Sequence, residues 1–473
     1  MKAVGKYLER IANSPLALTF KDVILLPSFS TIEPREVDLS TNITVNLRGS
    51  TPIVSSPMDT VTESALAIAM AMLGGLGVIH RNCSSEEQVN MVKKVKEAEV
   101  RCLKKVYLYS HSTIEEAEKV FRKTELESVP VINKTGSFVG YLSRRKLSSC
   151  DPQDHVYKCA EKGPVLRIKD LEKNSLNSQN IAVVDDNGRL FGVLANEGDE
   201  DIVSLLDEEG RLAVAAAISP FSEKRVELLE KWVDAFVVDV AHFHNINCIS
   251  ATKKLLKKTS REVVVGNIGT YEACVDIITS LDDVAGLRVG IASGSICSTG
   301  IVTGVAAPTL FAVASVRDAL EDYGASKIPI IADGGIGSPG DAAKALAAGA
   351  SSVMLGRALA GTSEASSPLI RVGGRLYKLY RGMGSKSALA ERYSADRYSA
   401  PSKKIAEGVE GLVPYRGSVE GVVREFREGL KAALGYVGAK NIPELWQKAR
   451  FARLTSVGFR EVLPHDIVLD IGL

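Results

Sequence analysis

Short runs of Val, Ile and Ala alternate with amphipathic stretches along most of the chain. Stretches such as SSEEQVNMVKKVKEAEV and SPGDAAKALAAGA repeat apolar residues three or four positions apart, which is typical of helices with one buried face. The apolar runs predict eight strands, at Thr51–Ser55, Gly77–Ile79, Ala213–Ile218, Ala235–Val240, Val263–Ile268, Leu287–Ile291, Ile328–Ala332 and Ser352–Leu355. Strands that alternate with helices in this way predict an α/β fold, a (β/α)₈ TIM barrel.

This rhythm is interrupted between the second and third predicted strands. The interruption contains two similar phrases, SVPVINKTGSFVGYLSRRKL and NIAVVDDNGRLFGVLANEGD, and each reads as strand, turn, strand and helix. An internal pair of this kind predicts a separate inserted module. We therefore expect the barrel to comprise residues 1–101 and 210–473, with the module in residues 102–209.

A second unusual segment, at about residues 377–415, is rich in Gly, Ser and charged residues. Its sequence, YRGMGSKSALAERYSADRYSAPSKKIAEGVEG, shows no strong periodicity. A long irregular excursion inside a compact domain is more often a functional lid than a scaffold. We expect a lid here.

Composition narrows the range of partners. The chain has 58 basic and 57 acidic residues and a net charge of +1, which favours neither a nucleic-acid nor a membrane partner. Its longest apolar stretches contain glycines and stop short of a membrane span, and its charged N-terminus lacks the apolar core of a secretory signal. We therefore expect a cytoplasmic protein. Its 7 cysteines show no CxxC pair or regular spacing, so neither a zinc site nor a disulfide framework is predicted.

The loop GIASGSICST follows the sixth predicted strand, at the end of the barrel where active sites form. Glycines let its backbone approach a ligand closely, and Ser295 suits a phosphate. Cys297 would be a nucleophile as its thiolate. Most single cysteines are instead small buried hydrophobes, but the surrounding GSxCST favours the nucleophile.

Two glycine-containing segments follow the seventh and eighth predicted strands, ADGGIGSPGDAAKA and MLGRALAG. Asp333 could accept hydrogen bonds from ribose hydroxyls, and Gly334 and Gly335 could present N–H groups to a phosphate. Arg357 could add a cation there, or be a solvated residue at a helix start. A single Asp-Gly-Gly is often only a turn, but the paired occurrence matches the usual phosphate position in such barrels.

At these residues the sequence resembles the IMP dehydrogenase/GMP reductase family. The motifs TFKDVILLP, SSPMDTVTE, GGLGVIHRN, GSICST, ADGGI, YRGMGS and EGVEG occur in family order over almost the whole chain. The inserted module resembles the paired cystathionine-β-synthase-type (CBS) domains found at this position in the family, with a shortened second copy. The resemblance implies oxidation of IMP to XMP with NAD⁺, a step of guanine nucleotide biosynthesis.

The resemblance also implies residue roles. Cys297 would add to the purine C2, a hydride would pass to the nicotinamide, and the lid would then close for hydrolysis of the thioimidate. Arg397 would be the general base, aided by Tyr398 and Thr299. The nucleotide would bind at Ser56, Met58, Ser295, Asp333, Gly334, Gly335, Gly356, Arg357, Tyr380, Gly382, Met383, Gly384 and Glu407, the last of these near N1 of the base.

The dinucleotide would bind near Asp239, Asn267, Gly290 and Ala292. Backbone carbonyls of Ala292, Gly294 and Cys297 would hold a monovalent cation, K⁺, with Glu461 contributed by a neighbouring subunit. The resemblance further implies a homotetramer, and a regulatory purine nucleotide as the ligand of the CBS-like module.

Several residues on the cofactor side depart from the family pattern. Ala292 and Phe243 stand in place of glycines, and Gly300 and Thr309 stand where arginine and glutamine are common. The span from Arg397 to Glu407 is also shorter than usual.

Two other functions remain open. GMP reductase activity, the NADPH-dependent conversion of GMP to IMP with release of ammonia, is favoured by the segment Asp239–Ala241. Against it stand Lys386 and Ser387, where reductases generally carry a glutamate, and the Asp396-Arg397-Tyr398 segment. A catalytically inactive nucleotide-binding regulator is the alternative from another class. The joint presence of Cys297, Thr299, Arg397 and Tyr398 argues against it.

Overall fold

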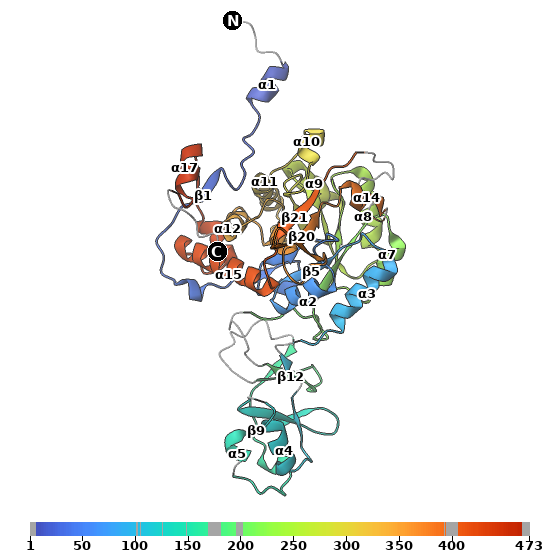
Figure 1. Cartoon of the computed structure of the whole chain (residues 1–473), viewed down its shortest axis with the longest axis vertical. Coiled ribbons are helices and arrows are strands. Elements are labelled where there is room, and N and C mark those ends of the chain that lie inside the picture. The colour runs from blue at the N-terminus through green and yellow to red at the C-terminus, as the bar shows by residue number, and fades with distance from the viewer. Residues whose placement is uncertain are drawn as a thin grey trace.

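The core of the molecule is a closed barrel of eight strands (Figure 1). This computed structural model describes residues 6–100, 103–104, 106–124, 126–147, 149–168, 181–194, 202–391, 393 and 405–465. In barrel order the strands are β4 (Ile53–Ser55), β5 (Leu76–Ile79), β13 (Val214–Ile218), β14 (Ala235–Val238), β15 (Glu262–Ile268), β16 (Val284–Val289), β17 (Ile330–Asp333) and β18 (Ser352–Leu355). All neighbours pair in parallel, and β18 closes on β4. The predicted barrel is confirmed, with small shifts at the strand ends.

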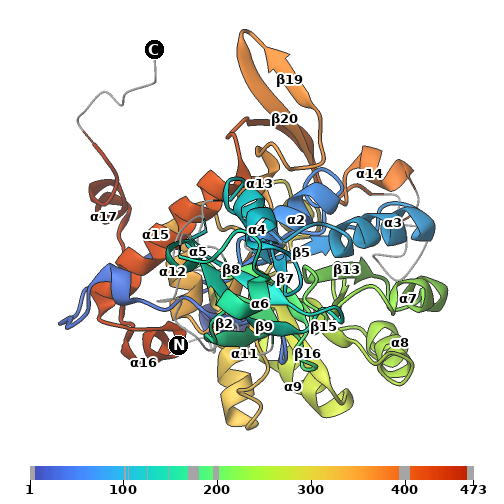
Figure 2. The same cartoon turned by 90° about the horizontal axis from the view of Figure 1, so that it is seen from below.

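Helices surround the barrel (Figure 2). They are α2 (Ser64–Met72), α3 (Ser85–Lys96), α7 (Glu223–Leu229), α8 (Ile246–Leu256), α9 (Tyr271–Ser280), α11 (Thr309–Asp322), α12 (Pro339–Ala347) and α15 (Val419–Val437). Their starts follow local sequence rules. Ser338 caps α12 by accepting the Asp341 N–H, and Pro339 occupies the first helical position, where a missing N–H costs nothing. No helix among the described residues is long and apolar enough to cross a membrane.

The chain leaves the barrel after α3 and returns just before β13. The helix α3 leads back from the carboxyl end of β5. The insertion therefore emerges at the amino-terminal face of the barrel, at the opposite end from α10 (Thr299–Thr303) (Figure 1). Its elements are β6 (Leu103–Lys104), β7 (Leu108–Tyr109), α4 (Ile114–Phe121), β8 (Ser128–Ile132), β9 (Phe138–Ser143), α5 (Arg144–Leu147), α6 (Val156–Cys159), β10 (Val165–Arg167), β11 (Ile181–Val184) and β12 (Leu190–Leu194).

The insertion contains two sheets, in the orders β7-β8-β9 and β10-β11-β12-β6. The two predicted hairpins are β8–β9 and β11–β12, each antiparallel. The helix predicted after the second hairpin lies largely outside the described residues. The assignment of the insertion to CBS-type domains stays a prediction.

Cys150 and Cys159 form a disulfide inside the insertion, where the sequence predicted no disulfide framework. The prediction was wrong because the pairing depends on how α5 and α6 pack, which the spacing of the cysteines does not reveal. Cys83, Cys248, Cys274 and Cys297 are free thiols.

The segment predicted to be irregular forms strands at both ends. β19 (Leu369–Val372), β20 (Arg375–Arg381) and β21 (Glu410–Pro414) make an antiparallel sheet, and α14 (Lys386–Ala390) follows β20. The two-residue strand period is present in RLYKLYR, since Lys378 and Tyr380 are buried and their neighbours are less so. A buried lysine obscured this pattern; its ammonium donates to the carbonyl oxygens of Thr362 and Ala365.

Smaller elements lie near both ends of the chain and in the loops after β16 and β18. They are α1 (Lys6–Ala12), β1 (Val23–Leu25), η1 (Pro34–Glu36), β2 (Thr41–Asn42), β3 (Arg48–Gly49), α10 (Thr299–Thr303), α13 (Arg357–Ala360), α16 (Ile442–Lys448), β22 (Phe451–Arg453) and α17 (Ser456–Glu461). β1 pairs with β22, so segments near both ends of the chain meet beside the barrel.

Lys96, on α3, forms ion pairs with two aspartates where the chain re-enters the barrel after the insertion. Its ammonium donates to Asp207 Oδ2 at 2.8 Å and to Asp234 Oδ2 at 2.6 Å. Asp207 lies in the segment that leads into β13, and Asp234 directly precedes β14. The lysine side chain is 2% exposed, so the ion pairs are shielded from water.

We expect Lys96→Met to lower the free energy of unfolding by about 3–5 kcal/mol, because it leaves the buried carboxylate of Asp234 without its cation and that of Asp207 with Arg211 alone. Lys94→Met, an exposed position of the same helix, should change it by no more than about 0.5 kcal/mol. Chemical denaturation of the two variants and the parent protein measures the difference. Equal midpoints for the two variants would contradict the role given to Lys96.

Candidate functional site

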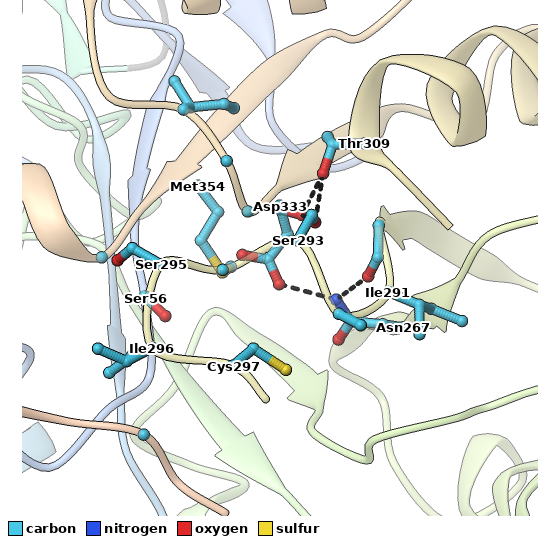
Figure 3. A pocket seen from close by; sticks show the side chains of 18 of the residues that line it. Ser56, Asn267, Ile291, Ser293, Ser295, Ile296, Cys297, Thr309, Asp333 and Met354 are labelled. Carbon is cyan, nitrogen blue, oxygen red and sulfur yellow. Dashed lines mark hydrogen bonds between the residues drawn. The ribbon is translucent and has the colours of Figure 1, made fainter. Parts of the chain in front are cut away.

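The carboxyl ends of the barrel strands surround a cavity of about 880 Å³. Figure 3 shows part of its wall, in which Ser295 and Cys297 lie on one loop and Asn267 and Asp333 come from two other segments of the chain. The predicted site residues that line this cavity are Ser56, Met58, Asn267, Gly290, Ala292, Gly294, Ser295, Cys297, Thr299, Asp333, Gly334, Gly335, Gly356, Arg357, Tyr380, Gly382, Met383, Gly384 and Glu407.

Two of the described site residues, Asp239 and Glu461, are not in this wall. Asp239 is 1% exposed and lies behind it. Glu461 ends α17 and is exposed, and its role toward a neighbouring subunit stays a prediction. Arg397 and Tyr398 fall outside the described residues.

The catalytic loop, residues 290–298, is held from two sides. At its start Ile291 exchanges both backbone hydrogen bonds with Ala307, each 3.0 Å long. At its end Ile296 O accepts from Val409 N at 3.0 Å and Ser298 N donates to Glu407 O at 3.1 Å. The loop therefore spans two fixed segments, and Cys297 is exposed at its second fixed end, between Ile296 and Ser298.

Cys297, Thr299 and Glu407 form a hydrogen-bonded chain. The thiol donates to Thr299 Oγ1 at 3.2 Å, and the threonine hydroxyl donates to Glu407 Oε2 at 3.1 Å. Glu407 is 5% exposed. A hydroxyl between a thiol and a carboxylate can pass a proton between them. The resemblance had implied for Glu407 only a contact with the base.

Arg288 joins two carboxylates beside the catalytic loop, the buried one of Asp239 and that of Asp333, which faces the cavity. Its Nη1 donates to Asp239 Oδ1 at 2.8 Å and its Nε donates to Asp333 Oδ2 at 2.8 Å. Burial disfavours the guanidinium cation, but the charges of Asp333 and Asp239 outweigh it and raise the pKa of Arg288. Sequence reasoning missed this residue, although a charged residue inside the apolar run VAGLRV was a signal of pairing.

Asn267 connects this ion-pair network to the catalytic loop. Its amide donates to Asp333 Oδ2 at 2.7 Å and to Gly290 O at 2.9 Å (Figure 3). On the other side, Arg81 Nη2 donates to Asp239 O at 3.0 Å and its Nη1 reaches Tyr393 O in the lid segment at 3.4 Å. Hydrogen bonds thus run from the lid segment to the carboxylate of Asp333.

The other end of the cavity is built from backbone amides and a phenol. Gly334 and Gly335 have φ of 97° and 74°, a backbone that side chains rarely adopt. A Cβ on Gly356 would lie 2.8 Å from the Tyr380 hydroxyl. Burial raises the pKa of Tyr380 to about 12, so its phenol stays protonated and can donate a hydrogen bond near the glycines.

The N-terminal arm supplies wall residues that sequence reasoning did not single out. Thr19, Phe20 and Lys21 line the cavity. The arm is held there because Lys344 Nζ donates to Phe20 O at 2.8 Å. Lys21 thus places a cation on the rim of the cavity. Its only sequence signal was its membership of the TFKDVILLP motif.

The departures from the family pattern have different consequences. Phe243 is fully buried and does not line the cavity; its N–H donates to Asn267 O. Thr309 does line the cavity. Ala292 has φ of 61°, in the left-handed region that favours glycine.

We expect Ala292→Gly to raise the free energy of unfolding by about 1 kcal/mol. Glycine relieves the strain of the left-handed backbone, and this gain exceeds the stabilisation that the extra freedom of glycine gives to the unfolded chain. Ala306→Gly, which also lies on the cavity wall but outside the left-handed region, should lower it by about 0.5–1 kcal/mol. Thermal unfolding of both variants gives the two signs, and the same sign for both would refute the strain at Ala292.

The chain is similar to known proteins over nearly its full length. The model of the IMP dehydrogenase / GMP reductase domain matches residues 17–465. The inosine-5'-monophosphate dehydrogenase of Korarchaeum cryptofilum is 50% identical over 471 residues, covering 97% of this chain and 98% of the relative. That of Methanocaldococcus jannaschii is 42% identical over 493 residues, covering 98% of each. A solved GMP reductase variant of Trypanosoma brucei in complex with guanosine 5'-monophosphate has a TM-score of 0.71 and 32% identity, covering 97% of this chain and 100% of the other.

Proposed function

This chain belongs to the IMP dehydrogenase/GMP reductase family, and we propose that it oxidises IMP to XMP with NAD⁺. The observation that carries the proposal is the exposed free thiol of Cys297, which faces the cavity and is hydrogen-bonded to Thr299. The names of the relatives, similar to this chain over nearly its full length, support the dehydrogenase.

In the proposed reaction the Cys297 sulfur adds to C2 of the purine and the hydride on C2 leaves. NAD⁺ supplies the acceptor for that hydride and becomes NADH. Water then attacks the thioimidate carbon, which releases XMP and restores the thiol. Overall, IMP, NAD⁺ and water give XMP, NADH and a proton. The chain Cys297–Thr299–Glu407 offers a path for the thiol proton as the sulfur attacks.

The two ends of the cavity suit the two substrates. We assign the nucleotide phosphate to Gly334, Gly335 and Arg357, near the Tyr380 phenol, and the ribose to Asp333. The nicotinamide half would lie toward Asn267, where Val240 and Ala241 also line the wall. Asp239 contacts Arg288 behind the wall, so its effect on the dinucleotide would pass through that arginine.

The proposed K⁺ site uses backbone carbonyls of Ala292, Gly294 and Cys297. All three residues belong to the catalytic loop. Gly294 O accepts the Cys297 N–H at 3.0 Å, and a carbonyl oxygen has a second lone pair for a ligand. The proposed tetramer would complete the site through Glu461 of a neighbouring subunit.

GMP reductase activity is a second candidate, favoured by one specific observation. The Thr299–Glu407 pair stands beside the sulfur, where it could also protonate an amine that leaves C2. The two activities are distinguished by supplying IMP with NAD⁺, or GMP with NADPH, and following the absorbance of the reduced dinucleotide. NADPH consumption on GMP, with no NADH formed from IMP, would establish the reductase.

With IMP and NAD⁺, we expect Cys297→Ala to lower kcat by at least about 10³-fold and to leave IMP affinity within about threefold, because only the covalent step is lost. Cys274→Ala removes a buried thiol on α9 and serves as the control, with parent-like turnover. NADH formation and equilibrium binding measure the two effects. Substantial turnover by Cys297→Ala would rule out covalent catalysis by this thiol.

For Arg397→Ala we expect NADH to form in a single burst and turnover to slow by about 10²–10⁴-fold, since the variant lacks the proposed base for hydrolysis. Intact-protein mass spectrometry should detect the adduct on Cys297. Arg371→Ala, an exposed arginine of β19, is the matched control and should neither accumulate adduct nor lose turnover. A variant that loses the burst itself would show that Arg397 acts before hydrolysis.

A further inference from the structure

Thr309 connects three segments of the active site through its hydroxyl. It is the first residue of α11 and is 2% exposed. Its Oγ1 lies 2.8 Å from Asp333 O, at the end of β17, and 2.7 Å from Ser293 Oγ, in the catalytic loop (Figure 3). The hydroxyl therefore lies between the loop that bears Cys297 and the strand end that bears Asp333.

The distances favour one order of donors in this arrangement. A carbonyl oxygen only accepts, and Asp333 O lies closer to Thr309 Oγ1, at 2.8 Å, than to Ser293 Oγ, so we assign the Thr309 proton to Asp333 O. The threonine oxygen is then an acceptor for the Ser293 proton. The alternative partner of Ser293 is the same Asp333 O, at the longer distance of 3.3 Å. The order is therefore Ser293 to Thr309 to Asp333 O, a sequence that we call the hydroxyl clamp.

The clamp holds the middle of the catalytic loop, between the two ends that backbone hydrogen bonds fix; there the side chain of Ser295 also hydrogen-bonds to Tyr380. Ser293 precedes Gly294, whose carbonyl accepts the Cys297 N–H and closes the turn that carries the thiol. Ser293 also packs on the phosphate side, since a Cβ on Gly334 would lie 2.5 Å from its Oγ. The clamp thus relates the position of Cys297 to that of the backbone amides at Gly334 and Gly335.

We propose that Thr309 is a positioning residue, and that the hydroxyl clamp holds the catalytic loop ready for a purine nucleotide before the nucleotide binds. That the ligand is a purine nucleotide rests on the proposed function, whereas the ordering of the loop by Thr309 and Ser293 rests on their hydrogen bonds alone. When a loop is already ordered in the free protein, less of the binding free energy is lost to ordering the loop. Loss of the clamp should therefore weaken nucleotide binding and change access to the Cys297 thiol, without unfolding the barrel.

The test compares Thr309→Val, which keeps the shape and removes the hydroxyl, with Thr309→Ser, which restores it. Thr252→Val is the control; Thr252 is fully buried in α8 and its hydroxyl has no hydrogen-bond partner among the described residues. Calorimetry measures IMP and GMP affinity without dinucleotide, and iodoacetamide measures the alkylation rate of Cys297 in the free protein. Ser293→Ala removes the other hydroxyl at a less buried position.

We expect Thr309→Val and Ser293→Ala to weaken nucleotide binding by at least about tenfold and to change the alkylation rate by at least about fivefold. Thr309→Ser should stay within about threefold of the parent protein in both, and Thr252→Val should match it. Thermal midpoints of the two clamp variants should stay close to that of Thr252→Val.

Parent-like affinity and alkylation in Thr309→Val and Ser293→Ala would overturn the proposal. So would a loss that Thr309→Ser does not rescue and that parallels a fall in the thermal midpoint, because Thr309 would then be only structural. If the parent protein binds neither nucleotide, the proposed function fails, and the alkylation rates alone decide whether the clamp orders the loop.

Discussion

The buried ion pairs of Arg288 hold the functional edge of the barrel together. Removing one partner from such a group leaves uncompensated charge in the interior, at a cost of about 3–5 kcal/mol. Here the central cation lies on β16 and its carboxylates lie at the ends of β14 and β17, so one side chain fixes three strands where the cavity opens. Asn267 adds β15 through Asp333. Under the proposed function, a ribose-binding carboxylate held in this way would need little rearrangement when the nucleotide binds.

The scaffold could be predicted from sequence because its signals are local. Strand runs such as Val263–Ile268 and helix starts such as Ser338-Pro339 carry their structure in a few neighbouring residues. The same holds for Cys297, whose glycine-rich surroundings follow a predicted strand. The disulfide between Cys150 and Cys159 has no such local signal, and it became visible only once α5 and α6 were in place.

The residues that support the site were not predictable in the same way. Arg288, Lys96 and Lys378 are charged side chains within apolar surroundings, and each is explained only by partners far away in the sequence. Because Lys378 is a buried charge in β20, the alternation of apolar and polar residues that predicts a strand is absent from the sequence there. Thr309 was visible as a departure from the family pattern, but its partners Ser293 and Asp333 come from other segments.

The segment predicted to be a lid begins and ends beside Cys297, the predicted nucleophile. Gly382 N donates to Val409 O at 2.9 Å and Glu407 N donates to Gly384 O at 3.0 Å, so the excursion between them leaves and returns at the same place. The same returning strand pairs with the catalytic loop, where Cys297 lies opposite Gly408. If this segment is the proposed lid, it would pivot on these ends beside the sulfur and would not carry the sulfur with it. In the proposed two-stage reaction, the adduct would then stay fixed on Cys297 while water replaces the dinucleotide above it.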